Sequence, residues 1–136
     1  MSSLTVARPL PILRDWNRSY WTSGEDGQLR FQHFGACDAL QHPPAPVCRA
    51  CGADQLDMRP VSGLGTVQSH TTNIQRWSVD FPPPFVVAVV AIDEDPRVRL
   101  TTNIVGCEPE TVCIGMRVRV LFERVDDVWI PLFEPT

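Results

Sequence analysis

The feature that most constrains this chain is a set of three closely spaced cysteines in its first half. Cys48 and Cys51 are separated by two residues and precede Gly52, so a tight turn can point both sulfur atoms at one place. Cys37 lies upstream of Cys48 with ten residues between them. A structural zinc site takes four sulfur or nitrogen ligands in a tetrahedron. The spacing therefore predicts most of a zinc ribbon, in which two such turns surround a metal ion.

The first cysteine turn is incomplete, because Phe34 stands where the fourth cysteine would fall. His33 is the nearest substitute, but neighbouring residues of a strand point to opposite sides, so its use as a ligand requires a local twist or bulge. Two alternatives stay open. Zinc is bound by Cys37, Cys48 and Cys51 with His33 or a water as fourth ligand, or Phe34 fills the vacated place and the ribbon is metal-free. In the metal-free case the second cysteine turn could instead be a redox pair.

Composition narrows the classes of protein to which the chain can belong. Its 136 residues suit one ordinary domain or a small module joined to one. The net charge of -4 disfavours a nucleic-acid groove, and five cysteines, an odd number, fit a reduced compartment better than a disulfide framework. The longest apolar run, residues 85–92, is far shorter than the roughly 20 residues that cross a bilayer. We expect a cytoplasmic protein that binds neither membranes nor nucleic acid.

Residues 12–22 carry apolar side chains at a spacing close to one helical face, which predicts a short amphipathic helix that ends near Gly24. This face either packs against the chain's own domain or offers its aromatic rings to a protein partner. The residues proposed for partner contact are Trp16, Tyr20 and Trp21.

The second half is a succession of short segments rich in valine, isoleucine and threonine, which predicts strands joined by turns. Five strands with no long helix between them favour a five-stranded OB-fold barrel, although an SH3-like barrel or a sandwich fits the same pattern. The predicted strands are residues 66–73, 85–93, 98–104, 117–125 and 128–133, with two ribbon strands at 28–34 and 56–60. The chain is thus expected to be mainly β, with an arm and helix (1–27), a zinc-ribbon-like module (28–62) and a barrel (63–136).

Several stretches also carry a family resemblance. They are residues 61–69 (VSGLGTVQS), 84–92 (PFVVAVVAI), 100–123 (LTTNIVGCEPETVCIGMRVRVLFE) and 131–136 (PLFEPT). Together with the short helix and the proline-containing ribbon, they resemble the acyl-CoA-associated OB-fold family, in which a rubredoxin-like zinc ribbon precedes an OB barrel. The resemblance covers residues 12–136.

The resemblance implies an accessory subunit that assembles with a thiolase-fold enzyme acting on acyl-CoA thioesters. The larger partner would carry the catalytic residues, and the reaction would be that of a thiolase or of a retro-aldolase that shortens steroid side chains. The small subunit would support assembly of the hetero-oligomer and help to enclose the CoA thioester, with zinc as its own cofactor. No catalytic residue is expected in this chain.

The segment 73–84 is long for a hairpin connection and holds Trp77, Phe81 and three prolines. It could present an aromatic edge to a partner or acyl chain, or it could fold over the open end of the barrel. Arg49 and Arg76 are the cations that we expect to contact the phosphates of CoA.

Two other functions remain alternatives. OB barrels and zinc ribbons also bind single-stranded nucleic acid, and aromatic side chains for base stacking are present. A stand-alone acyl-CoA hydrolase or dehydratase is the second alternative, although we find no motif that pairs a nucleophile with a base. His42 and His70 are expected to be an ordinary loop residue and an ordinary strand residue, and Cys107 and Cys113 small apolar residues near a barrel turn.

Overall fold

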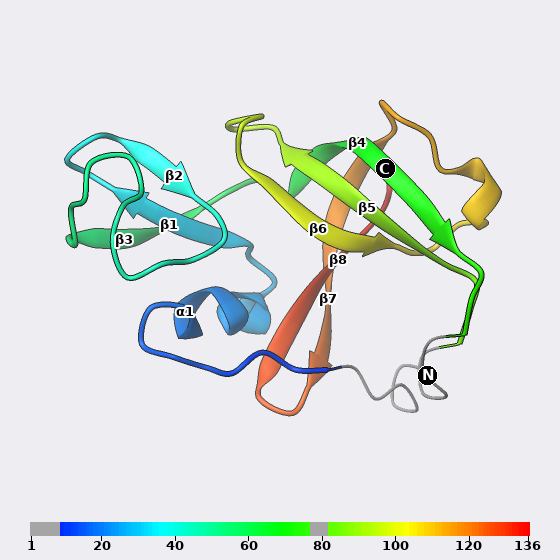
Figure 1. Cartoon of the computed structure of the whole chain (residues 1–136), viewed down its shortest axis with the longest axis horizontal. Coiled ribbons are helices and arrows are strands. Elements are labelled where there is room, and N and C mark those ends of the chain that lie inside the picture. The colour runs from blue at the N-terminus through cyan, green and yellow to red at the C-terminus, as the bar shows by residue number, and fades with distance from the viewer. Residues whose placement is uncertain (1–8, 77–81) are drawn as a thin grey trace.

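The computed structural model describes residues 9–76 and 82–136. A small three-stranded sheet from the first half of the chain lies beside a closed barrel from the second half, and the N-terminal helix lies next to both (Figure 1). Among the described residues, no helix has the length and apolar character needed to span a bilayer.

The N-terminal helix is shorter than the sequence predicts. Helix α1 (Arg18–Trp21) makes a single turn and is followed by the 3-10 helix η2 (Ser23–Asp26). Ahead of it, the Asn17 side chain accepts a hydrogen bond from the Arg14 N–H at 2.6 Å and donates one to the Ile12 carbonyl at 3.0 Å. Asparagine bonds of this kind offer the backbone a turn in place of a helix. Ile12 is therefore outside the helix and 70% exposed.

The ribbon sheet has the order β2-β1-β3. Its central strand β1 (Arg30–Phe34) pairs antiparallel with β2 (Ala39–Gln41) on one side and with β3 (Leu56–Pro60) on the other. The sequence predicts β1 and β3. It does not reveal β2, because three residues are too few to show an alternating pattern.

The barrel consists of five strands in the order β4-β5-β6-β8-β7, with β7 pairing back onto β4. Every pair is antiparallel except β6 and β8, which run parallel where Ile104 meets Phe133. The 3-10 helix η3 (Pro109–Thr111) lies between β6 and β7. The strands are β4 (Leu64–Asn73), β5 (Phe85–Ile92), β6 (Arg99–Ile104), β7 (Arg117–Val125) and β8 (Val128–Pro135). The predicted five-stranded OB barrel is confirmed.

One apolar core joins the two modules. Tyr20 from α1 and Phe31 from β1 belong to the same buried cluster as Val90 and Phe133 of the barrel. Gly24 sits so close to the Phe122 ring that an added Cβ would overlap it, so η2 also packs directly on the barrel. The ribbon is therefore held against the barrel, and the aromatic face of residues 12–22 packs on its own domain through Tyr20.

Candidate metal centre and cleft between the modules

The structure brings the three predicted cysteine ligands together. Cys37 lies in the turn between β1 and β2, and Cys48 and Cys51 lie in the connection between β2 and β3. The Sγ atoms of Cys37 and Cys48 are 3.5 Å apart, and all three sulfur atoms lie within 4.8 Å of one another. The second turn is closed by a 2.8 Å hydrogen bond from the Gly52 N–H to the Cys48 carbonyl, with Gly52 at a φ of 78° that favours glycine.

The local electrostatics favour ionisation of Cys48 over that of Cys37. Backbone N–H groups, above all that of Cys51, stabilise its thiolate and lower its pKa to about 7. Once Cys48 is charged, its hydrogen bond with Cys37 favours the protonated form there, which raises the pKa of Cys37 to about 11. Three neighbouring thiolates repel one another unless a cation sits between them.

The three sulfur atoms fit a zinc ion. Zinc–sulfur bonds are about 2.3 Å long, so thiolates of a tetrahedral site lie about 3.8 Å apart. The separation of 3.5 Å between Cys37 and Cys48 is close to this value, and no sulfur atom lies more than 4.8 Å from another. The residue at the position of the missing cysteine, Phe34, has no exposed surface and offers no donor atom. Zinc held by Cys37, Cys48 and Cys51 would have a structural role, because it would join two turns of a module that is too small to build its own core.

His33 is not brought together with the cysteines. Its Nδ1 lies 2.8 Å from an oxygen of Asp57 on β3, and its Nε2 lies 2.8 Å from an oxygen of Asp38. Hydrogen bonds to Asp38 and Asp57 raise the pKa of this imidazole above its ordinary value. Both ring nitrogens are thus engaged by carboxylates, and the structure supplies no free nitrogen at this position for a metal.

Sequence reasoning missed two buried glutamines that organise the ribbon. Gln32 on β1 and Gln41 on β2 face each other in register. Gln32 donates to the Ala45 carbonyl at 2.9 Å and accepts from the Ala45 N–H at 3.0 Å. Gln41 donates to the Val47 carbonyl at 3.0 Å and accepts from the Arg49 N–H at 2.8 Å. These bonds hold the proline-rich segment and the second cysteine turn in place. The only sequence signal for the two glutamines is a polar residue within a short, otherwise largely apolar strand.

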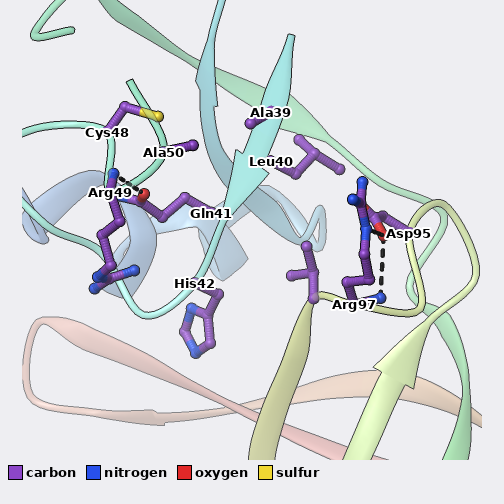
Figure 2. Close-up of a pocket in the computed structure, with 10 residues that line it drawn as sticks. Ala39, Leu40, Gln41, His42, Cys48, Arg49, Ala50, Asp95 and Arg97 are labelled. Atoms are coloured by element: carbon purple, nitrogen blue, oxygen red, sulfur yellow. Dashed lines mark hydrogen bonds and ion pairs between the residues drawn. The ribbon is translucent and has the colours of Figure 1, made fainter. Parts of the chain in front are cut away.

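A cleft of about 280 Å³ lies where the ribbon meets the turn between β5 and β6 (Figure 2). Arg49 and Arg97 stand on opposite sides of it. The Arg49 guanidinium donates to the Pro43 carbonyl at 2.7 Å, and the Arg97 guanidinium forms a 3.0 Å ion pair with Asp95. Both cations retain exposed surface, so the cleft presents positive charge to solvent.

His42, also on the cleft, packs its ring against Tyr20 and Phe31 at centroid distances of 4.7 and 5.3 Å. Burial lowers its pKa to about 4, so it is neutral near pH 7. Its Nδ1 is buried, and no hydrogen-bond partner for it is found among the described residues. The ring therefore acts mainly as an apolar surface between α1, the ribbon and the cleft.

The remaining predicted contact residues are dispersed. Trp16 is 37% exposed, with the Arg14 guanidinium over its ring, whereas Tyr20 is buried. Trp21 is half-buried and packs edge-on against Tyr20. Arg76 is exposed, and Trp77 and Phe81 lie outside the described residues. Among residues not assigned to the site, His70 is exposed on β4, Cys107 is half-buried against the core and Cys113 is exposed.

The two modules match two family models. Residues 21–57 match the rubredoxin-like zinc ribbon domain of ChsH2, and residues 58–123 match its C-terminal OB-fold domain. This chain belongs to the ChsH2 family. The resemblance seen in the sequence is thereby confirmed, together with the order of ribbon and barrel.

Similar proteins include a chain of an aldolase, a hydratase subunit and a scaffold protein. A chain of the solved Ltp2–ChsH2(DUF35) aldolase superposes with a TM-score of 0.83 at 31% identity, over 93% of this chain and 98% of that one. A probable enoyl-CoA hydratase alpha subunit of Thermomonospora curvata is 33% identical over 94% of this chain, and a DUF35 domain-containing scaffold protein of Methanocaldococcus jannaschii is 28% identical over 67% of it. This chain spans only 40% of that hydratase subunit and 64% of that scaffold protein.

Proposed function

We propose that this chain is a non-catalytic accessory subunit of a hetero-oligomeric enzyme, that its partner is a thiolase-fold protein, and that the complex acts on acyl-CoA thioesters. The observation that carries the proposal is the similarity, over nearly the whole of both chains, to a chain of the Ltp2–ChsH2(DUF35) aldolase. That chain is one component of an aldolase named for two proteins. The hydratase subunit is longer, so its activity can reside in the part that this chain does not match.

The positions of the three histidines support a non-catalytic role. A general base that activates a nucleophile needs a free ring nitrogen within hydrogen-bond reach of it. His33 is held between two carboxylates, and His42 is buried against aromatic rings. His70 is exposed on β4. In the described parts of the chain, none of these histidines is paired with a cysteine or serine.

The cleft between the modules is the place where we expect the chain to contact the CoA part of the substrate. Arg49 and Arg97 could bind phosphate groups from opposite sides, because guanidinium groups form strong charge-assisted hydrogen bonds with phosphates. The volume of about 280 Å³ is just below the usual range for pockets that hold a whole ligand. The cleft would therefore enclose part of the CoA arm, and the acyl group would be bound by the partner.

Co-expression with thiolase-fold proteins from the same organism tests the proposal. The expected result is a stable complex on size-exclusion chromatography that converts an acyl-CoA, while this chain alone has no turnover. Product analysis then separates thiolysis from retro-aldol cleavage. Turnover by the isolated chain, or failure to bind any thiolase-fold protein offered, would contradict it.

Replacing the two arginines tests the role of the cleft within the complex. Arg49→Gln and Arg97→Gln should each raise KM for the acyl-CoA by about tenfold with little change in kcat, because one charge-assisted bond to the substrate is lost in each. Arg124→Gln is the matched control, since Arg124 stacks on Trp129 near the turn between β7 and β8. An unchanged KM in both cleft variants would show that the cleft does not contact the CoA part of the substrate. It would not affect the proposal that the chain assembles with a thiolase-fold partner.

A further inference from the structure

The three cysteines of the ribbon form an incomplete ligand set for zinc. We propose that Cys37, Cys48 and Cys51 bind zinc through three thiolates and leave a fourth coordination position open, which accepts a thiolate from a small molecule outside the chain. This inference is independent of the proposed enzyme partner, because it rests only on the geometry of the ribbon.

The chain does not supply a fourth ligand at this position. Phe34 occupies the place that the spacing reserves for a cysteine, and its side chain is fully buried. His33 is held by Asp38 and Asp57 through both ring nitrogens. Within residues 9–76 and 82–136, no other histidine, cysteine or acidic side chain groups with the three sulfur atoms.

Two of the three cysteines lie at the surface of the ribbon. Cys37 and Cys51 are exposed residues, whereas Cys48 is only 2% exposed. The cluster therefore reaches the surface at Cys37 and Cys51, while Cys48 anchors it in the ribbon. A zinc ion with three protein ligands binds water or an exogenous ligand in its fourth position, which is the arrangement of open zinc sites.

The ribbon keeps the sulfur atoms together without a fourth protein ligand. The Arg49 N–H, between the two cysteines of the second turn, is bound by Gln41 at 2.8 Å, and the Cys48 N–H is bound by the Ala53 carbonyl at 2.8 Å. Gln32 holds the preceding segment through Ala45. These hydrogen bonds help to position the cysteine turns, as a complete set of metal ligands does in a closed ribbon. The turns therefore stay ordered with one ligand fewer.

A thiolate is the ligand that best fits this position. A zinc site with three sulfur ligands favours a fourth soft donor. Because Phe34 fills the place of the missing cysteine, an external thiolate would bind from the exposed side of Cys37 and Cys51. Binding of a thiol would release its proton and displace the bound water, with no change in the oxidation state of sulfur or metal.

Cobalt substitution tests the site directly, because sulfur-to-cobalt charge-transfer bands report the number of bound thiolates. The full chain, prepared with a phosphine reductant and no added thiol, should bind one Co²⁺ with a three-thiolate spectrum. Titration with 2-mercaptoethanol should then strengthen the charge-transfer band and shift the ligand-field bands to those of a four-thiolate site. No binding of Co²⁺, or a spectrum that does not respond to the thiol, would overturn the proposal.

Two variants make the result specific. Phe34→Cys should give the four-thiolate spectrum without added thiol, should not respond to 2-mercaptoethanol, and should bind zinc at least about 10-fold more tightly, since even loss of an outer-shell contact commonly costs that much. His33→Gln should leave the wild-type spectrum and its response to thiol unchanged. A spectral change in His33→Gln would make His33 the fourth ligand and refute the open site. If Phe34→Cys does not fold, the wild-type titration and His33→Gln still decide the question.

Discussion

The barrel and the ribbon are stabilised by different kinds of interaction. The barrel closes on itself through backbone pairing, and its interior is filled by apolar side chains such as Val90 and Phe133. The ribbon has three short strands, and it contains three of the five buried polar or charged side chains found in the described residues, namely Gln32, His33 and Gln41. A module too small to bury much apolar surface depends on specific polar bonds and metal ligands, whereas a closed barrel depends on burial.

We expect the largest loss of stability from a substitution in the core of the barrel. Phe133→Ala should lower the free energy of unfolding by about 3–5 kcal/mol, because a fully buried ring is replaced by a cavity. Since Tyr20 and Phe31 share this core, both modules should unfold in one transition. Urea denaturation followed by near-UV circular dichroism measures both quantities. Ile114→Ala, at a residue 70% exposed, is the control and should change stability by less than about 0.5 kcal/mol.

Replacing a buried polar residue of the ribbon should affect mainly the ribbon. Gln32→Leu removes the hydrogen-bond partner of the Ala45 N–H, the Ala45 carbonyl and the Trp16 carbonyl. We expect the free energy of unfolding to fall by about 3 kcal/mol, at the upper end of the cost of buried unsatisfied groups. Hydrogen exchange should accelerate most at Ala45, whose N–H loses its partner, and less at the β5 amides. Gln55→Leu, at an exposed position, is the control. Equal loss of protection in both modules would contradict the separate roles of polar bonds and burial.

The contact of η2 with the barrel can be tested by two glycine substitutions. Gly24→Ala forces a methyl group against the Phe122 ring and should cost about 1–3 kcal/mol, the usual range for overpacking. Gly35→Ala should be close to neutral, because no atom lies within 4 Å of its added Cβ and its φ is not in the left-handed region. Thermal unfolding of both variants measures the difference. If the two variants have the same melting temperature, the contact of η2 with the barrel does not contribute to stability.

The smallest effect is a pH dependence that belongs to the ribbon. Because Asp38 and Asp57 raise the pKa of His33, the folded state favours its charged form. Its contribution to stability should be fully present below pH about 6.5, the ordinary pKa of histidine, and should be lost as the pH rises through the raised value. When the free energy of unfolding is measured as a function of pH, this decrease with rising pH should be absent in His33→Gln. His70→Gln, at an exposed residue of β4, should keep it.

Sequence reasoning succeeded where the signal is local. The richness of residues 85–93 and 117–125 in valine and other strand-forming residues predicts barrel strands, and β5 and β7 lie at those positions. The spacing of Cys48 and Cys51 predicts a turn that points its sulfur atoms to one place, and the structure shows it. The same reasoning extended α1 too far, because it counted apolar spacing and did not weigh the Asn17 side chain, which stabilises a turn ahead of the helix.

The sequence by itself determined the architecture of this protein: a cysteine ribbon, then a five-stranded barrel, in a chain of the ChsH2 family. Backbone geometry explains this success, because strand periodicity and cysteine spacing are properties of neighbouring residues. Only the tertiary structure decided that His33 binds Asp57, 24 residues away, and that Arg49 and Arg97 line opposite sides of one cleft. Such pairs form when distant segments pack on a shared core, and no local pattern records which side chains will then meet.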